Sequence, residues 1–145
     1  MRCSLVLLAF SLLWSLASCA ATGEPFHRGE PVPGKASLYI YVVQKTLLRL
    51  DTWDVYLDGK QVTELRGGDY FYSTVSPGPH TILVKVQLFT KLSVNLSADP
   101  DTTYYFRVRM EAPGYVFRWF LERVTEPQAL SELTDLTLVP GSDPR

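Results

Sequence analysis

The sequence shows no grouping of side chains of the kind that performs catalysis, and the settings of its two histidines favour structural roles. His27 lies in a stretch rich in Gly and Pro, where we expect a solvated side chain, and His80 follows Pro77-Gly78-Pro79 at the start of a strand. The ring of His80 should therefore bond a loop carbonyl or a neighbouring carboxylate. The sequence contains no His-Glu-x-x-His pair, no Gly-x-Ser-x-Gly elbow and no phosphate-binding glycine loop. We predict a protein that is not an enzyme, with no catalytic residues, no metal and no cofactor.

Three polar motifs are explained better as turns or strands than as sites. Asp99 and Asp101 flank Pro100 on a loop, which indicates a turn or, at most, a weak calcium contact. Arg66-Gly67-Gly68-Asp69 is typical of a hairpin turn. Asn95-Leu96-Ser97 spells a glycosylation sequon, but it lies within a strand pattern and matters only in a eukaryotic host.

Cys19 is the cysteine whose setting indicates chemistry. Arg2 gives a positive start, an apolar run spans Leu5 to Trp14, and small residues precede the cysteine, which is the layout of a cleaved secretory signal. The run is too short to cross a bilayer. Leu16-Ala17-Ser18-Cys19 resembles the lipobox of bacterial lipoproteins, in which diacylglyceryl alkylates the cysteine thiol before cleavage. The resemblance implies that residues 1–18 are removed and that Cys19 becomes the acylated first residue, with palmitate as an expected acyl group.

An ordinary secretory signal is the alternative, because cleavage after Ala20 or Ala21 would also follow small residues. Once Cys3 leaves with the signal, Cys19 is the only cysteine, so no intramolecular disulfide can form. Several acyl chains on one residue make membrane attachment effectively permanent. Ala20 stands where enterobacterial lipoproteins retained in the inner membrane carry Asp, so the resemblance implies the outer membrane, facing the periplasm.

The charge of the mature chain is close to neutral. The formal net charge of the full sequence is −1, and Arg2 is the only charged residue before Cys19. Nucleic-acid-binding domains carry a strongly basic surface. No nucleic-acid partner is therefore expected.

The elements that must position these residues are mostly strands. Six stretches alternate apolar and polar side chains with a period of two, at residues 38–43, 54–58, 81–88, 92–97, 104–111 and 117–122. Leu57-Asp58-Gly59-Lys60, at the end of the second stretch, carries the Asp-Gly signal for a two-residue hairpin with positive φ. Turns recur about every ten residues, which predicts an all-β fold, an antiparallel β-sandwich of about seven strands.

The remaining segments are assigned from their composition. Residues 19–35 contain Gly and Pro without an apolar period and are predicted to be a flexible tether reaching about 20–25 Å. The β-sandwich domain then spans residues 36–139, and residues 140–145 form a disordered tail. Thr125-Glu126-Pro127-Gln128 matches a capping box, so a short C-terminal helix should begin there and cover one end of the sheet with Leu130 and Leu133.

One set of side chains has the chemistry of a recognition surface. Aromatic and arginine residues supply much of the binding energy at protein interfaces, and aromatic rings also stack on sugars. Such residues lie opposite the aliphatic side of the strands, and the binding candidates among them are Tyr39, Tyr41, Tyr105, Arg107, Arg109 and Arg118, with Tyr56 and Phe120 beside them. The alternative is that they form cross-strand pairs or a second core. Because an unpaired buried arginine is costly, we expect this face to meet water or a partner.

The turn pattern also resembles a known class of surface domains. Residues 55–62 followed by residues 75–82 resemble the strand, Asp-Gly-Lys, strand, Pro-Gly-x-His-Thr layout of PEGA-like domains. With residues 103–108 added, the pattern resembles small bacterial lipoproteins that carry an uncharacterised domain, over about residues 36–125. The resemblance implies a small β-sandwich anchored to an envelope membrane, and it implies no catalytic residues.

The expected function is that of a membrane-anchored envelope lipoprotein acting as a non-enzymatic binding or structural module. Its partner would be another envelope protein or a cell-wall polysaccharide. The alternative is a soluble periplasmic or secreted carbohydrate-binding β-sandwich. A small hydrolase is least favoured, since the sequence lacks a nucleophile with an oriented base.

Overall fold

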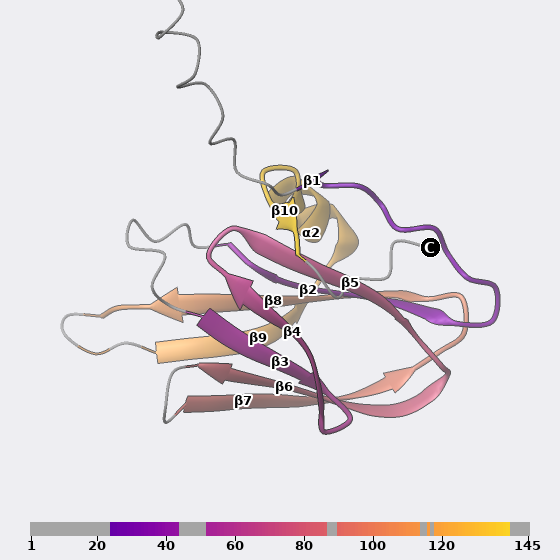
Figure 1. The fold of residues 1–145 in the computed structure, drawn as a ribbon, viewed down its shortest axis with the longest axis horizontal. Helices are drawn as coiled ribbons and strands as arrows, with labels where there is room; N and C mark the ends of the chain where they lie inside the picture. The colour runs from indigo at the N-terminus through magenta and orange to yellow at the C-terminus, as the bar shows by residue number, and fades with distance from the viewer. Residues whose placement is uncertain (1–23, 44–51, 87–89, 114–115, 117, 140–145) are drawn as a thin grey trace, which may run out of the picture.

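Two β-sheets and one helix make up the described part of the protein. The computed structural model describes residues 24–43, 52–86, 90–113, 116 and 118–139 (Figure 1). The signal sequence, Cys19 and the predicted tail lie outside these residues. The six-stranded sheet has the order β1-β10-β5-β2-β8-β9, and the four-stranded sheet has the order β4-β3-β6-β7. The strands are β1 (Glu24–Pro25), β2 (Ala36–Val42), β3 (Thr52–Leu57), β4 (Lys60–Arg66), β5 (Asp69–Val75), β6 (Gly78–Val86), β7 (Thr90–Ala98), β8 (Thr103–Glu111), β9 (Arg118–Val124) and β10 (Thr137–Leu138).

The central pairing of the six-stranded sheet is parallel. Strand β2 pairs with β8 in parallel register, with Leu38 opposite Tyr104, and β10 pairs with β5 in the same sense. The all-β sandwich is confirmed and most of its strand pairs are antiparallel, as expected, but these two pairs are parallel. Turn spacing indicates only which consecutive strands form hairpins. Strands β3 to β7 lie between β2 and β8 in the chain, so the spacing of turns does not reveal that β2 and β8 pair.

Strand β5 carries no sequence alternation because both of its faces are buried. Tyr70 and Tyr72 point to one side of the sheet, and Phe71 and Val75 belong to the core on the other side. The turn before it, Gly67-Gly68, takes the chain from β4 in one sheet to β5 in the other, and Gly68 has φ +93°. The expected turn at Arg66-Gly67-Gly68-Asp69 is therefore present, but it is not a hairpin, because β4 and β5 belong to different sheets and do not pair.

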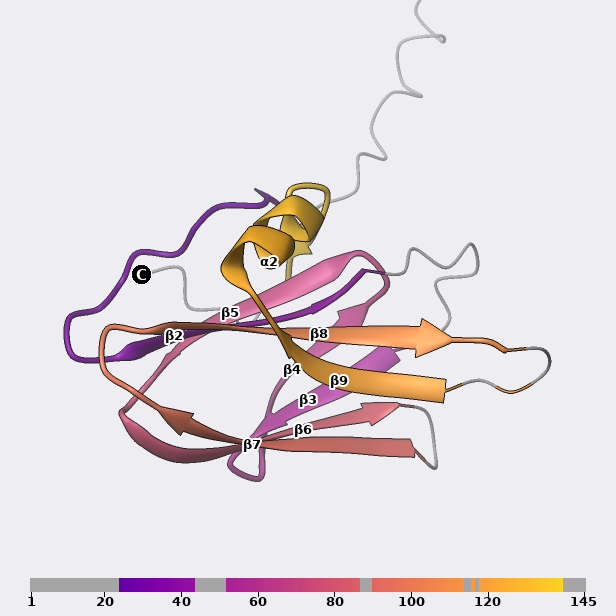
Figure 2. The same cartoon turned by 180° about the vertical axis from the view of Figure 1, so that it is seen from behind.

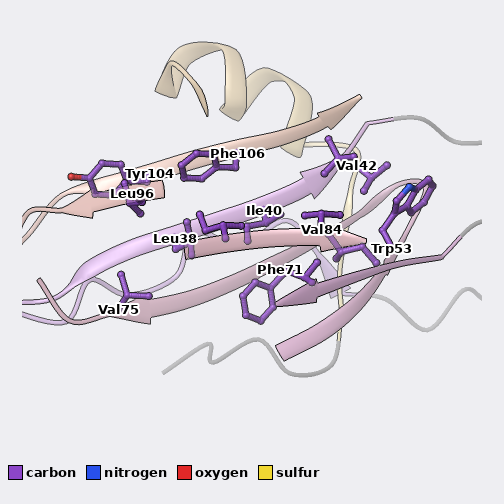
Figure 3. Close-up of a cluster of buried hydrophobic side chains, with 14 of the residues drawn as sticks. Leu38, Ile40, Val42, Trp53, Phe71, Val75, Val84, Leu96, Tyr104 and Phe106 are labelled. Atoms are coloured by element: carbon purple, nitrogen blue, oxygen red, sulfur yellow. The ribbon is translucent and has the colours of Figure 1, made fainter. Parts of the chain in front are cut away.

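The main core lies between the two sheets. Leu38, Ile40 and Val42 on β2 face Val84 and Trp53 from the four-stranded sheet, and Phe71 and Phe106 fill the same layer (Figure 3). These side chains sit on the apolar side of the alternation that the sequence shows. Burial of this aliphatic and aromatic layer supplies the main driving force of folding.

The Asp58-Gly59 hairpin has the predicted conformation. Asp58 has φ +52° and Gly59 has φ +82°, and the two residues alone connect β3 to β4. A type I′ turn requires positive φ at both central residues, and its twist matches that of the flanking strands.

Helix α2 (Glu126–Leu133) covers the outer side of the six-stranded sheet, away from the four-stranded sheet (Figure 2). Thr125 is the N-cap residue, as predicted, but its side chain makes no capping hydrogen bond. Gln128 instead donates from Nε2 to Oε1 of Glu132 at 3.4 Å. Within the helix, the side chains of Ala129 and Leu133 are fully buried, while that of Leu130 is only partly buried. Among the described residues, none forms a helix long and apolar enough to cross a membrane.

Candidate functional site

Five tyrosines on the outer face of the six-stranded sheet form what we call the tyrosine layer. Its members are Tyr39 and Tyr41 on β2, Tyr70 and Tyr72 on β5, and Tyr105 on β8. Each is at most 2% exposed, since α2, Phe26 and the chain around β10 pack over them. Their rings pack closely, with the centroid of Tyr39 at 5.0 Å from that of Tyr105 and 4.8 Å from that of Tyr72.

The tyrosine layer overturns part of the predicted recognition surface. Tyr39, Tyr41 and Tyr105 were expected to meet water or a partner, and this is wrong because they are buried in a second core. Burial raises the pKa of Tyr39 to about 12 and also raises the pKa of Tyr105, so both hydroxyls remain neutral donors or acceptors. The alternative of a two-sided core is the one that the structure bears out.

Residues 26–30, the N-terminal arm, are fastened to the tyrosine layer through their backbone. The Gly29 N–H donates to the Tyr39 hydroxyl at 2.8 Å, and the His27 N–H donates to the Tyr70 hydroxyl at 3.1 Å. The Tyr72 hydroxyl donates to the Glu30 carbonyl at 2.9 Å. The ring of Phe26 packs edge-on against that of Tyr70, with centroids 5.4 Å apart. Just before the arm, β1 pairs with β10.

The prediction of a flexible tether over residues 19–35 is therefore wrong for its described part, residues 24–35. The Gly and Pro content that suggested a linker instead allows close approach, because a Cβ at Gly29 would overlap the ring of Tyr72. Two signals could have revealed this. Phe26 is a large apolar residue in an otherwise polar stretch, and tyrosines buried on the second sheet face need partners for their hydroxyls.

Arg107 and Arg109 are held in a charge network with three glutamates. Arg107 contacts Glu122 and Glu132 at 2.5 Å each, and Arg109 contacts Glu122 at 2.7 Å and also Glu111. Glu132 lies on α2, so Arg107 ties the helix to β8 and β9. Hydrogen bonds from Arg107 are the main cause that lowers the pKa of Glu122, despite its partial burial.

This charge network replaces the predicted positive patch. Arg107 and Arg109 do not lie free on the surface, because glutamates on three elements neutralise them. Tyr41 joins the same network by donating to Oε2 of Glu132 at 2.7 Å. Of the six binding candidates, Arg118 on β9 is the exposed one, opposite Glu111 in the strand register.

His80 bonds both a carboxylate and a loop carbonyl, as predicted. Its Nδ1 lies 2.7 Å from Oδ2 of Asp58, and its Nε2 lies 2.7 Å from the Ser76 carbonyl. Both partners are acceptors, so both ring nitrogens must donate, which requires the imidazolium form. The bond to Asp58 is the main cause that raises the pKa of His80, and the bond to His80 lowers the pKa of Asp58. This pair holds the 58–59 hairpin against the turn before β6.

The loop with Asp99 and Asp101 is a turn. Asp101 has φ +56° and its Oδ1 accepts the Gly34 N–H at 2.8 Å, while Asp99 accepts the Tyr104 hydroxyl at 3.1 Å. In residues 24–139, apart from the gaps in the description, no three His, Cys, Asp or Glu side chains group so that they could hold a metal ion.

Two adjoining depressions lie where the N-terminal arm meets the start of α2. Their volumes are about 360 and 250 Å³, and both are lined by Thr103 and Glu126. Arg28 and Glu126 form an ion pair there, with side chains 57% and 48% exposed. Burial raises the pKa of the Tyr105 hydroxyl, and the charge and side-chain hydrogen bonding of Arg28 act in the opposite direction. The smaller depression is lined by Arg28 and Gly29 of the arm, whereas the larger one lies between β8, the end of β9 and the start of α2.

The outward face of the four-stranded sheet, which we call the outer polar face, is the exposed sheet surface. Its residues alternate with the core residues Trp53, Val55 and Val84, and they include Asp54, Tyr56, Gln61, Glu64, Thr81, Leu83, Lys85, Lys91, Ser93 and Asn95. Tyr56 stands near its centre, where Lys85 Nζ donates to its hydroxyl at 2.8 Å and lies 4.0 Å from its ring centroid. Tyr56 thus belongs to a different sheet from the other tyrosines of the predicted surface.

Comparison with known proteins identifies the family. Residues 33–118 match the family described as "Protein of unknown function (DUF2846)", and this match covers more than half of the chain. The chain belongs to this family. The DUF2846 match starts just before β2 and ends at the first residue of β9, so it includes neither the N-terminal arm nor α2. The prediction of a family with an uncharacterised domain is confirmed, close to the expected residues 36–125.

A relative of this DUF2846 protein is an uncharacterized protein of Haemophilus influenzae. The two are 26% identical over 111 residues, which cover 74% of this chain and 63% of the relative. This chain therefore matches less than two thirds of the length of that relative. No solved structure matches the chain.

Proposed function

We propose that the protein is a lipoprotein of the bacterial cell envelope, acylated at Cys19, whose β-sandwich acts as a non-enzymatic binding or structural module. The observation that carries the proposal is the position of Cys19. It ends a signal-type segment in the lipobox-like Leu16-Ala17-Ser18-Cys19 and stands only five residues before β1. The PEGA-like turn pattern agrees with a domain displayed on a surface. The outer membrane, facing the periplasm, is the proposed location, since Ala20 follows the cysteine.

The non-enzymatic part of the proposal is supported by what the reactive side chains do. His80 bonds two turns together, and Arg107 and Arg109 neutralise glutamates between β8, β9 and α2. Each of these groups has a structural partner that would have to be released before it could act on a substrate. The proposed partners are an envelope protein or a cell-wall polysaccharide, besides the membrane itself.

The experiment that tests acylation compares the full chain with its Cys19→Ser variant in a bacterial host. We expect the parent in the membrane fraction, with an intact mass equal to a chain starting at Cys19 plus acyl groups. Cys19→Ser should lose the acyl mass and the membrane association. Cys3→Ser is the matched control, because Cys3 lies within the removed segment, and it should behave as the parent. A mature chain that begins at Ala20 or Ala21 would contradict the proposal.

A soluble carbohydrate-binding domain is the second candidate, favoured by the outer polar face. Tyr56 offers a partly exposed ring among carboxylate, amide and hydroxyl groups, with Gln61 donating to Asp54 at 3.1 Å. Calorimetric titration with peptidoglycan fragments tests it, with Tyr56→Ala expected to abolish the heat of binding. Tryptophan fluorescence is a poor reporter here, because Trp53 is fully buried against Trp119. Titrations without heat for the parent would exclude this candidate.

A further inference from the structure

The N-terminal arm fixes where the chain enters the fold. Its backbone bonds to Tyr39, Tyr70 and Tyr72, together with the pairing of β1 with β10, hold residues 24–30 on the outer side of the six-stranded sheet. In both views of the fold, β1, β10 and α2 gather on this side and the four-stranded sheet lies on the other (Figures 1 and 2). The chain thus enters beside α2, far from the outer polar face.

The length of chain before the fold is short. Five peptide steps connect Cys19 to Glu24, and a fully extended chain spans at most about 3.3–3.6 Å per residue. Cys19 can therefore lie no more than about 17 Å from the start of β1. This connection is much shorter than the predicted tether up to Lys35, so the domain has less freedom to turn relative to the anchor.

We propose that the anchored protein is held with the surface formed by α2 and the N-terminal arm toward the bilayer, and with the outer polar face directed away from it. The inference rests on the proposed acylation of Cys19. Packed sheets lie about 10 Å apart and a helix has a diameter of about 10 Å, so the outer polar face is roughly 20 Å farther from the bilayer than α2. The outer polar face is then the surface that a partner in the periplasm meets.

The charges of the bilayer-facing surface indicate that the lipid anchor alone holds it there. Arg28 is paired with Glu126, and Glu30 and Asp135 add exposed acidic groups. Bacterial membranes containing phosphatidylglycerol are anionic, and like charges repel at such a surface. The surface should therefore lie near the headgroups without inserting, and the protein without acyl groups should not bind vesicles.

The experiment uses two single-site fluorescent labels on the acylated protein. Ser131→Cys places a label on α2 and Ser93→Cys places one on the outer polar face, and both serines are exposed. Cys19 is blocked by its acyl group, so each variant carries one free thiol. The proteins are reconstituted in phosphatidylethanolamine–phosphatidylglycerol vesicles whose headgroups carry nitroxide quenchers. We expect several-fold stronger quenching of the Ser131→Cys label than of the Ser93→Cys label.

A third variant tests whether the arm causes the orientation. Gly29→Ala should lift the arm, because the added Cβ overlaps the Tyr72 ring, and it should bring the quenching of the two labels close together. Equal quenching in the acylated parent would overturn the orientation while leaving the proposed function intact. Quenching that stays unequal in Gly29→Ala would overturn the role of the arm. Intact mass is measured on the same samples, and a chain without acyl groups would overturn the proposed function and this inference with it.

Discussion

Single residues fix the turns at the end of the molecule where β3 meets β4. Gly59 has φ +82°, and no atom lies within 4 Å of the position of an added Cβ. A side chain at position 59 would therefore clash with no other atom, and its cost would come from the strain of a positive φ alone. The cost of a substitution at Gly59 should therefore follow the preference of each residue type for positive φ.

We predict that Gly59→Val lowers the free energy of unfolding by about 1–2 kcal/mol, because a β-branched residue is strained in the left-handed region. Gly59→Asn should cost clearly less, since Asn visits that region readily. Urea unfolding of the two variants measures the difference. Equal stability of Gly59→Val and the parent would contradict the hairpin conformation.

His80 gives these turns a dependence on pH. Its pKa is raised in the folded state by the bond to Asp58, so its stabilising effect is complete below the ordinary value of 6.5 and declines as the pH rises through the higher folded value. The pKa of Asp58 is lowered, so its own effect is complete above the ordinary 3.8 and declines as the pH falls through the lower folded value. The pair should stabilise the fold most between these two ordinary values.

We predict that His80→Ala lowers the free energy of unfolding by about 1 kcal/mol near pH 5.5, the usual net value of such hydrogen bonds, and by less near pH 9. Asp58→Asn is the matched control, because Asn tolerates the φ of +52° and keeps an acceptor for the Thr81 N–H while removing the charge. It should reduce the pH dependence as His80→Ala does. A stability difference that does not change with pH would count against the imidazolium.

The elements are joined by the charge network as well as by the apolar cores. Arg107 side-chain atoms are 18% exposed, and their removal would leave Glu122 and Glu132 without this partner. Breaking a largely buried ion pair by deleting one partner is strongly destabilising. Arg107, which was expected from the sequence to meet water or a partner, is therefore expected to contribute to stability instead.

We predict that Arg107→Met lowers the free energy of unfolding by about 2 kcal/mol, while Arg118→Met, an exposed arginine on the neighbouring strand, stays within about 0.5 kcal/mol of the parent. Chemical denaturation of the two variants provides the comparison. If both arginines proved equally dispensable, the network would contribute nothing to the attachment of α2.

Sequence patterns predicted the elements best where one face is apolar and the other polar. The strands around Val55, Val84 and Val94 alternate in this way, and the Asp58-Gly59 turn follows from its residue types. Strand β5 escaped detection because tyrosines and apolar residues bury both of its faces. The second core was only an alternative, since alternation cannot distinguish a tyrosine that meets solvent from one that lies beneath a helix. Parallel pairing of β2 with β8 depends on contacts distant in the chain, which local patterns do not encode.

At the scale of the whole molecule, the arm unites the second core with the entry point of the chain. Three of the five hydroxyls in the tyrosine layer bond the backbone of residues 27–30, so the layer is closed on one side by chain that precedes the sandwich. The arm and α2 lie outside the residues matched by the DUF2846 family. The two-sheet core should therefore stay folded when the arm is released.

We predict that Gly29→Ala detaches the arm while leaving the sandwich folded, because the added Cβ overlaps the Tyr72 ring. The amides of His27 and Gly29 bond tyrosine hydroxyls, and they should lose most of their protection from hydrogen exchange. The amide of Gly68, which donates to the Val42 carbonyl at 3.0 Å, should keep its protection. Tyr72→Phe is the graded control, since it removes the hydroxyl that bonds Glu30 but leaves the ring in place, and it should reduce protection of the arm less. Unchanged protection at His27 and Gly29 in Gly29→Ala would mean that the arm tolerates a side chain there, while lost protection at Gly68 would mean that the arm is required for the sandwich itself.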